Sequence, residues 1–276
     1  MKILNLLILT LFTNFLNAQD FTGKININKD KKYEIVSSGT SKIIMPDMEM
    51  LMTNESLTSL KVGETSDTGY TLITKIEKLK LSGGKDSSFK IIMFDSEDPN
   101  DFQNAEIAST VAGKIGVEKS ISLNRNTGRI LNSVSENNDE DMIEKTLNPL
   151  STEDISFNEL FLLIPNGTKI GNSWTTEDSL NGFKTKTNYT IKEVKNNIAS
   201  VDFNGISNFT KTFSNQGNNI FVQAQIIKSG YLLVNIYTGI LQKKTMKTNC
   251  ETATVAMGET ETIKMISTSD TLFVEK

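Results

Sequence analysis

The chain has 276 residues, with 29 Lys and Arg against 33 Asp and Glu, no His and a single Cys. Without His there is no His-based catalytic triad and no imidazole metal site, and one Cys can neither close an intramolecular disulfide nor complete a Cys-rich zinc site. The net charge of −4 also argues against a nucleic-acid partner, because phosphate affinity comes mostly from clustered Lys and Arg.

The first 18 residues are typical of a signal peptide. Lys2 supplies the positive n-region, residues 3–16 are mostly apolar, and Ala18 is the small residue expected at a cleavage site. The apolar stretch is too short and too polar to span ~30 Å of hydrocarbon, and no later stretch is apolar enough to form a transmembrane helix. We therefore expect a periplasmic or secreted protein that begins at Gln19 after cleavage.

In the rest of the chain, polar residues alternate with Ile, Val, Leu and Phe, which is the period of half-buried β-strands. Residues that tolerate turns separate several of these windows, at 82–84, 126–128, 166–167, 204–205, 216–218 and 238–239. The predicted fold class is all-β, or β-dominated, with antiparallel strands. In chain order, the predicted strands are 31–38, 42–52, 70–76, 87–94, 117–123, 129–134, 187–194, 198–203, 219–234, 240–248, 251–257 and 260–267.

Three short helices are predicted between the strands. Asp101 can cap a helix over 102–112, the acidic run 139–141 can begin a second helix that ends before Pro149, and Ser151 can cap a third that runs to about Leu163. The last two helices form a connector over 137–165. The chain is thereby divided into a first β-rich half over 19–136 and a second β-rich half over 166–276.

The two halves share short sequence patterns. Residues 124–128 and 235–239 both read Asn-x-x-Thr-Gly, and residues 70–72 and 189–191 both begin with Tyr-Thr. A duplication of this kind produces either two related sheets or one continuous curved sheet, a half-barrel, over a shared core.

Four segments, taken in order, resemble an uncharacterised family of secreted or periplasmic β-rich proteins from Gram-negative bacteria. They are the Met-rich residues 45–52, residues 94–99, Gly128, and residues 169–174 with their Gly-Asn-Ser-Trp sequence. The family is a domain of unknown function, so the resemblance implies export, a β-rich fold and a Met-rich early strand, but no catalytic residue. More distantly, the paired strands with a Thr-Gly turn and the Gly-x-x-Trp sequence at 171–174 resemble periplasmic lipid-carrier half-barrels, at the level of the fold only.

The Met-rich segment is the sharpest local feature. Alternation along a strand places Met48, Met50 and Met52 on one face. Three thioether sulfurs could form a Cu(I) site, whereas flexible Met side chains could equally fill a core or line a cavity, and the second interpretation is the more common one. We expect Met48, Met50, Met52, Met93 and Trp174 to bind a ligand, with Trp174 alternatively serving as a core anchor.

No residue set predicts catalysis. The acids at 95, 97, 98 and 101 are explained by a turn and a helix cap, and no pair of carboxylates stands out. The chain has no Gly-x-Ser-x-Gly sequence and no His that could serve such a Ser. We therefore predict no catalytic residue, no metal site and no cofactor. Cys250 is expected to be a buried small residue or, alternatively, an exposed thiol that links two copies.

The leading prediction is a non-catalytic, exported protein. It would bind a hydrophobic or amphipathic small molecule, such as a lipid, or a partner in the cell envelope, in the concavity of the curved sheet. The alternatives are a Cu(I)-handling protein that uses the Met-rich strand, and a purely structural envelope protein.

Overall fold

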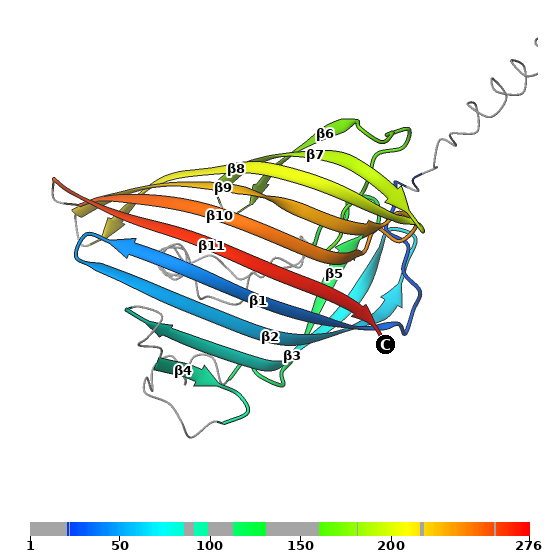
Figure 1. Cartoon of the computed structure of the whole chain (residues 1–276), viewed down its shortest axis with the longest axis horizontal. Coiled ribbons are helices and arrows are strands. Elements are labelled where there is room, and N and C mark those ends of the chain that lie inside the picture. The colour runs from blue at the N-terminus through cyan, green and yellow to red at the C-terminus, as the bar shows by residue number, and fades with distance from the viewer. Residues whose placement is uncertain are drawn as a thin grey trace, which may run out of the picture.

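The computed structural model describes residue 21 and residues 23–85, 91–98, 113–130, 160–180, 182–215, 218–256 and 258–276. These residues form one antiparallel sheet of eleven strands (Figure 1). The strands are β1 (Lys32–Met45), β2 (Met48–Thr65), β3 (Gly69–Gly84), β4 (Ile91–Asp95), β5 (Glu118–Asn124), β6 (Ser173–Leu180), β7 (Phe183–Lys195), β8 (Ile198–Asn215), β9 (Asn218–Asn235), β10 (Leu241–Ala256) and β11 (Glu259–Glu275).

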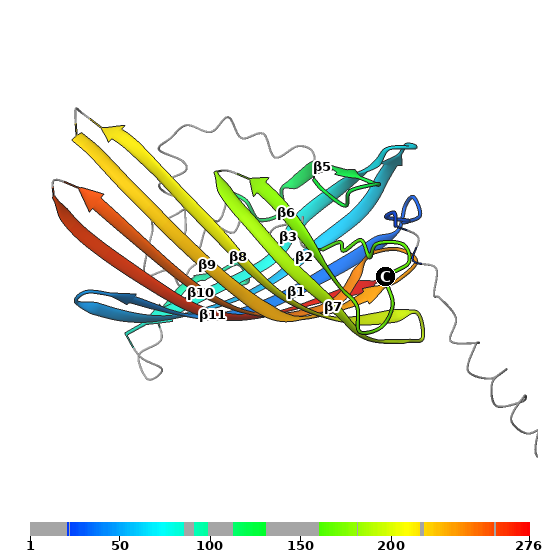
Figure 2. The same ribbon diagram turned by 90° about the horizontal axis from the view of Figure 1, so that it is seen from above.

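The sheet is continuous and strongly curved, with one concave and one convex face (Figure 2). Its strand order is β4-β3-β2-β1-β11-β10-β9-β8-β7-β6, and β5 pairs with β3. The last strand, β11, lies beside β1 over the whole stretch from Tyr33 opposite Glu275 to Ile44 opposite Lys264. The strands from the two parts of the chain therefore share one sheet, which confirms the β-dominated class and the continuous curved sheet rather than two separate sheets.

Most of the strands are longer than the predicted ones, and most of them are paired on both sides. The predicted strand 42–52 is wrong as a single element, since β1 and β2 form a hairpin in which Met45 pairs with Met48. The turn falls at Pro46 and Asp47, and Pro has no N–H to donate to a ladder. Conversely, the turns predicted at 82–84 and 204–205 lie inside β3 and β8.

The predicted helices find no support in the described residues. The segments 102–112 and 139–148 lie outside the described residues. The described end of the third segment is extended, because Phe161 forms a β-bridge with Ile240, and Leu162 N donates to Gly239 O at 2.9 Å. Pairing with the backbone of 239–241 thus replaces a helix at 160–163. The described part of the chain also contains no helix with the length and apolar character needed to cross a membrane.

The two Asn-x-x-Thr-Gly turns have the same hydrogen bonds. The Asn124 side chain accepts from the N–H groups of residues 126 and 127 at 2.9 and 3.0 Å, and the Asn235 side chain accepts from those of 237 and 238 at 3.0 and 3.1 Å. In both turns the Gly N–H donates to the Asn carbonyl, at 2.9 Å for Gly128 and 2.8 Å for Gly239. A local pattern therefore forms the same local structure in both halves.

The expected match between 70–72 and 189–191 does not extend to their positions in the sheet. Gly69 pairs with Asn124, whereas the residue opposite Asn235 is Ile198, the first residue of β8. By this register Tyr70 corresponds to Ala199 rather than to Tyr189. Both segments begin with Tyr-Thr, but they lie in different places relative to the two turns.

One end of the concave face is packed by two chain segments that cross it, residues 23–27 and 160–164. Ile25 is fully buried, and its methyl carbon Cδ1 would lie 3.8 Å from a Cβ added at Gly128 and 2.6 Å from a Cβ added at Gly239. The Tyr70 hydroxyl donates to Ile25 O at 3.2 Å and accepts from Ile27 N at 3.3 Å. We call this region the packed end.

Candidate ligand-binding site

The register of the strands assigns each side chain to one face. On β8, Val201 and Phe203 are 0% and 6% exposed, whereas their neighbours Asp202 and Asn204 are exposed. Cross-strand partners share a face, so each inward residue of β8 identifies an inward residue on the next strand. The buried residues of all strands lie on this same face, which is the concave face covered by the packed end.

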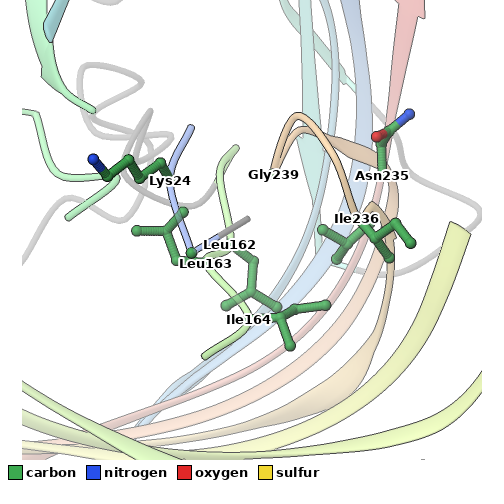
Figure 3. Close-up of a pocket in the computed structure, with 9 residues that line it drawn as sticks. Lys24, Leu162, Leu163, Ile164, Asn235, Ile236 and Gly239 are labelled. Atoms are coloured by element: carbon green, nitrogen blue, oxygen red, sulfur yellow. The ribbon is translucent and has the colours of Figure 1, made fainter. Parts of the chain in front are cut away.

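A pocket within the packed end is too small for a lipid. It lies between residues 162–164 and Lys24 on one side and Asn235, Ile236 and Gly239 on the other (Figure 3), and Gly23 also lines it. The space holds about one water molecule. Side chains of the surrounding core, including Val234 and Ile236 at 0% and 5% exposure, fill the rest. This pocket therefore has no room for a larger ligand.

Beyond the packed end, the concave face carries a row of small and polar residues. The row crosses seven strands from β6 to β1, and each member pairs with the next. Three of its members are buried: Gly205, and Thr187 and Thr248 with 4% and 9% exposure. We call this set the polar row; it consists of Thr176, Thr187, Gly205, Lys228, Thr248, Ser267 and Ser41.

The next row toward the tips of the β1–β2 and β10–β11 hairpins is apolar. Its members come from five adjacent strands, and each is half-buried. We call this set the apolar row; it consists of Met50, Ile43, Met265, Cys250 and Ile226. Adjacent strands lie ~4.8 Å apart, so the row is about 19 Å long. It is an apolar strip that the rest of the described chain leaves partly accessible.

Strand β9 shows how the three regions follow one another. Its inward residues are first Val234 and Leu232, which belong to the packed end and are 0% and 5% exposed. Gly230 and Lys228 come next, and Ile226 follows in the apolar row. Because inward residues are about 7 Å apart along a strand, a molecule only a few atoms long reaches from the polar row to the apolar row.

The structure separates the predicted ligand residues. Met50 lies in the apolar row, Met48 is 43% exposed at the hairpin tip, and Met52 is 4% exposed. Met93 is in β4, and its side chain lies outside the described part of the chain. Trp174 is in β6, at the other edge of the sheet from the Met residues in β2. The sheet therefore does not bring these five residues to one point.

Trp174 instead lies in an aromatic group on the concave side of β6, β7 and β8. Its ring stacks on that of Tyr189, with the ring centroids 5.2 Å apart. The Tyr189 ring in turn lies beside the Phe203 ring, with their centroids 6.4 Å apart. Among the described residues, the indole nitrogen Nε1 of Trp174 is buried and has no hydrogen-bond partner. An indole N–H can only donate, so this group is suited to an acceptor oxygen.

Lys228 reaches toward this aromatic group across Gly205. A Cβ at Gly205 would lie 3.3 Å from both Cγ and Cε of Lys228, so the lysine stem lies over the position where a side chain on β8 would be. Burial lowers the pKa of the Lys228 ammonium, and electrostatic attraction to Tyr189 and Asp178 opposes this shift. The ammonium is therefore within electrostatic range of both groups.

Asp178 is also bound by a cation from the first part of the chain. Arg129 Nη2 lies 3.3 Å from Asp178 Oδ1 and donates to Glu177 O at 3.2 Å. This contact joins the turn after β5 to the edge strand β6. Asp178 therefore has two cations near it, Arg129 in an ion pair and Lys228 within electrostatic range.

A second lysine, Lys244, lies closer to the packed end. It pairs with Leu232 on β9 and Thr271 on β11, so it shares the concave face. Burial lowers the pKa of its ammonium to about 8. Sequence reasoning missed both lysines, as well as Met265, Cys250 and Ile226. The alternation within each strand predicts which face of the sheet these residues lie on. Which of them lie close together depends on the register between strands, which alternation does not give.

The acidic segment at 95–98 forms a turn, as predicted. Glu97 N donates to Asp95 Oδ1 at 3.0 Å, and Lys80 Nζ lies 2.7 Å from Asp95 Oδ2. Hydrogen bonding from Lys80 lowers the pKa of the Asp95 carboxyl. Asp101 lies outside the described residues. Within the described ranges, no three His, Cys, Asp or Glu side chains come together as a metal-ion site.

No protein-family model matches the chain, and no curated protein is detectably similar to it. Among solved structures, lipovitellin, in a structure described as showing lipid–protein interactions, is 11% identical over 91% of this chain and 25% of its own, with a TM-score of 0.45. OpdQ of Pseudomonas aeruginosa is 6% identical over 90% of this chain and 100% of its own, with a TM-score of 0.21. An outer membrane channel from Pseudomonas putida F1 is 8% identical over 94% of this chain and 99% of its own, with a TM-score of 0.20.

Proposed function

We propose that the protein is an exported, non-catalytic binder of an amphipathic lipid, held on the concave face of the sheet. The observation that carries this proposal is the half-buried apolar row beside the polar row. An acyl chain lies along the apolar row, and the polar part of the lipid contacts the polar row. This arrangement matches the two chemical ends of an amphiphile.

The composition of the apolar row suits an acyl chain. Met50 and Met265 have flexible, polarisable side chains that adapt to an irregular hydrocarbon surface, and Cys250 behaves as a small apolar residue. Burying one methylene group contributes about 0.8 kcal/mol, so ten of them contribute about 8 kcal/mol, which corresponds to micromolar affinity before the entropic cost of association is subtracted. Affinity of this order needs no covalent step and no metal.

Two adjacent residues on opposite faces of β11 provide a matched pair of variants to test lipid binding. Met265 and Ile266 are adjacent on β11, but Met265 points into the concave face, whereas Ile266 is 50% exposed on the convex face. We expect Met265→Trp to fill the apolar row and weaken binding of a fluorescent fatty-acid probe by at least tenfold. Ile266→Trp adds the same indole to the other face and should leave binding unchanged. Met50→Trp, at the end of the row, should have a smaller effect than Met265→Trp.

A wild-type protein that binds no probe, or two variants that bind it equally, would leave the purely structural interpretation in place of this proposal. Urea unfolding of each variant separates loss of the site from loss of the fold. Export is tested on protein isolated from its native source, because the intact mass should correspond to a chain that begins at Gln19. Retention of residues 1–18 contradicts export with cleavage at this position.

A further inference from the structure

Three hydrogen-bond donors lie on the concave face at the levels of Gly230 and Lys228 along the strands, between the packed end and the apolar row. They are the Trp174 indole N–H on β6, the Tyr189 hydroxyl on β7 and the Lys228 ammonium on β9. Trp174 and Tyr189 are stacked, and Lys228 is within electrostatic range of Tyr189. The three donors therefore belong to one local group, although they come from three strands.

The Trp174 indole is the strongest indication that this group binds a ligand. Its nitrogen is buried and lacks a hydrogen-bond partner among the described residues. A buried donor without an acceptor destabilises the folded state, so native proteins rarely keep one without a purpose. Stacking on Tyr189 holds the indole in place, which fixes the direction in which the N–H can donate.

Two cations lie near these donors. The first is Lys228, and the second is Arg129, whose Nη2 lies 3.3 Å from Asp178 Oδ1. Gly205 is what allows the Lys228 stem to cross β8, because any larger residue would meet its Cγ and Cε. A cation together with two neutral donors is a set that suits an anionic oxygen group.

We propose that Trp174, Tyr189 and Lys228 form the headgroup site of the amphiphile, and that this site takes a carboxylate or a phosphate attached to an acyl chain. The inference rests on the proposed function, since the chain occupies the apolar row. Lys228 and Ile226 point to the same face of β9 two residues apart, so an acyl chain that runs from the donors back along the Lys228 stem reaches Ile226.

Trp174 is the only tryptophan in the sequence, which makes it a direct reporter. Bromine quenches tryptophan fluorescence at short range, so fatty acids brominated at different carbons measure the distance from Trp174 to each part of the chain. We expect bromine next to the carboxylate to quench Trp174 much more than bromine next to the terminal methyl. Equal quenching at both positions, or stronger quenching from the methyl end, overturns the proposal.

Variants then test the individual donors with two ligands of equal chain length, a fatty acid and the corresponding long-chain alcohol. We expect Lys228→Gln to weaken fatty-acid binding about tenfold, which is about 1.4 kcal/mol, and to leave alcohol binding unchanged. Lys186→Gln is the matched control, because Lys186 is on β7 and lies 3.0 Å from Glu177 on the convex face. Replacement of Trp174 by β-(3-benzothienyl)alanine keeps the shape but removes the N–H, and it should weaken binding of the fatty acid with no loss of stability.

The outcomes separate this inference from the proposed function. If the wild type binds neither ligand, the proposed function fails. If it binds both ligands, but Lys228→Gln and Lys186→Gln have equal effects, the headgroup site is wrong and lipid binding stands. Competition with inorganic phosphate and with acetate tests whether the site binds free anions. The proposal requires that neither anion displaces the fatty acid at millimolar concentration. Displacement by either one assigns the site to free anions instead.

Discussion

Gly205 offers the most informative single substitution, because it lies where Lys228 crosses β8. A Cβ at this position would lie 2.9 Å from Thr187 Oγ1 and 3.3 Å from Lys228 Cγ and Cε. All three atoms belong to side chains, and the Lys stem has several rotatable bonds. We therefore expect Gly205→Ala to be accommodated by a shift of a few tenths of an ångström in Thr187 and by a new path for the Lys228 side chain.

The expected effect on stability is small. Gly within a strand costs roughly 0.5–1 kcal/mol relative to Ala, because it loses more backbone entropy on folding. This gain offsets the cost of moving the buried Thr187 side chain, so the net change in the free energy of unfolding should be within about 1 kcal/mol. The affinity for a fatty acid should nevertheless fall up to about tenfold, or about 1.4 kcal/mol, since the Lys228 ammonium is displaced from its position near Tyr189.

Gly230→Ala is the contrasting variant on the neighbouring strand. Its Cβ would lie 1.9 Å from the carbonyl oxygen of Thr245 and 2.9 Å from the carbonyl carbon, and a backbone group cannot rotate away as a side chain can. We expect a loss of at least about 3 kcal/mol in the free energy of unfolding. Urea unfolding measures both variants, and titration with the fatty acid and the long-chain alcohol follows for Gly205→Ala. The reasoning is refuted if Gly205→Ala is as unstable as Gly230→Ala, or if it binds the fatty acid as the wild type does.

Three further predictions concern stability and metal binding. Asn124→Ala and Asn235→Ala each remove the one side-chain oxygen that accepts from two backbone N–H groups, so each should lower the free energy of unfolding in urea by about 1–2 kcal/mol, whereas Asp at either position should cost less. Burial lowers the pKa of the Lys244 ammonium from 10.5 to about 8, so between these pH values the unfolded chain holds a proton that the folded chain has lost. The free energy of unfolding should therefore rise from pH 8 to pH 10.5. The rise should be absent in Lys244→Met. Titration with Cu(I) against a competing chelator should reveal no tight site, because Met48 is exposed at the hairpin tip while Met52 is buried; sub-nanomolar binding that is lost in Met48→Ala and Met50→Ala contradicts this expectation.

The sequence predicts the class of this fold well because alternation is a local property. Ile, Val and Phe at every second position indicate a strand whatever its partners, and the two Asn-x-x-Thr-Gly turns follow from the acceptor on each Asn side chain. Local signals fail where pairing outweighs them. Asn204-Gly205 has the composition of a hairpin turn, yet β7 and β9 pair with both sides of this stretch, and Gly205 is used there for a close approach of Lys228.

The candidate site is harder to predict because it depends on register between distant strands. Alternation identifies the face of Met50 on its own strand, but Met265 and Cys250 join it only because β11 pairs with β1 on one side and β10 on the other. No local pattern specifies that pairing. The sequence groups Trp174 with the Met residues, and the order of strands places it with Tyr189 instead.

The order of the regions along the concave face determines how a ligand can lie on it. The packed end is filled by residues 23–27 and 160–164, so neither the headgroup nor the chain of a lipid fits there. The polar row comes next, and the apolar row lies beyond it toward the hairpin tips. A lipid with its headgroup at Lys228 therefore extends its chain away from the packed end, with Met50 and Met265 along the chain. In this orientation the charged group lies deepest, where partial burial strengthens its interaction with the donors, and the adaptable residues contact the part of the ligand whose length varies.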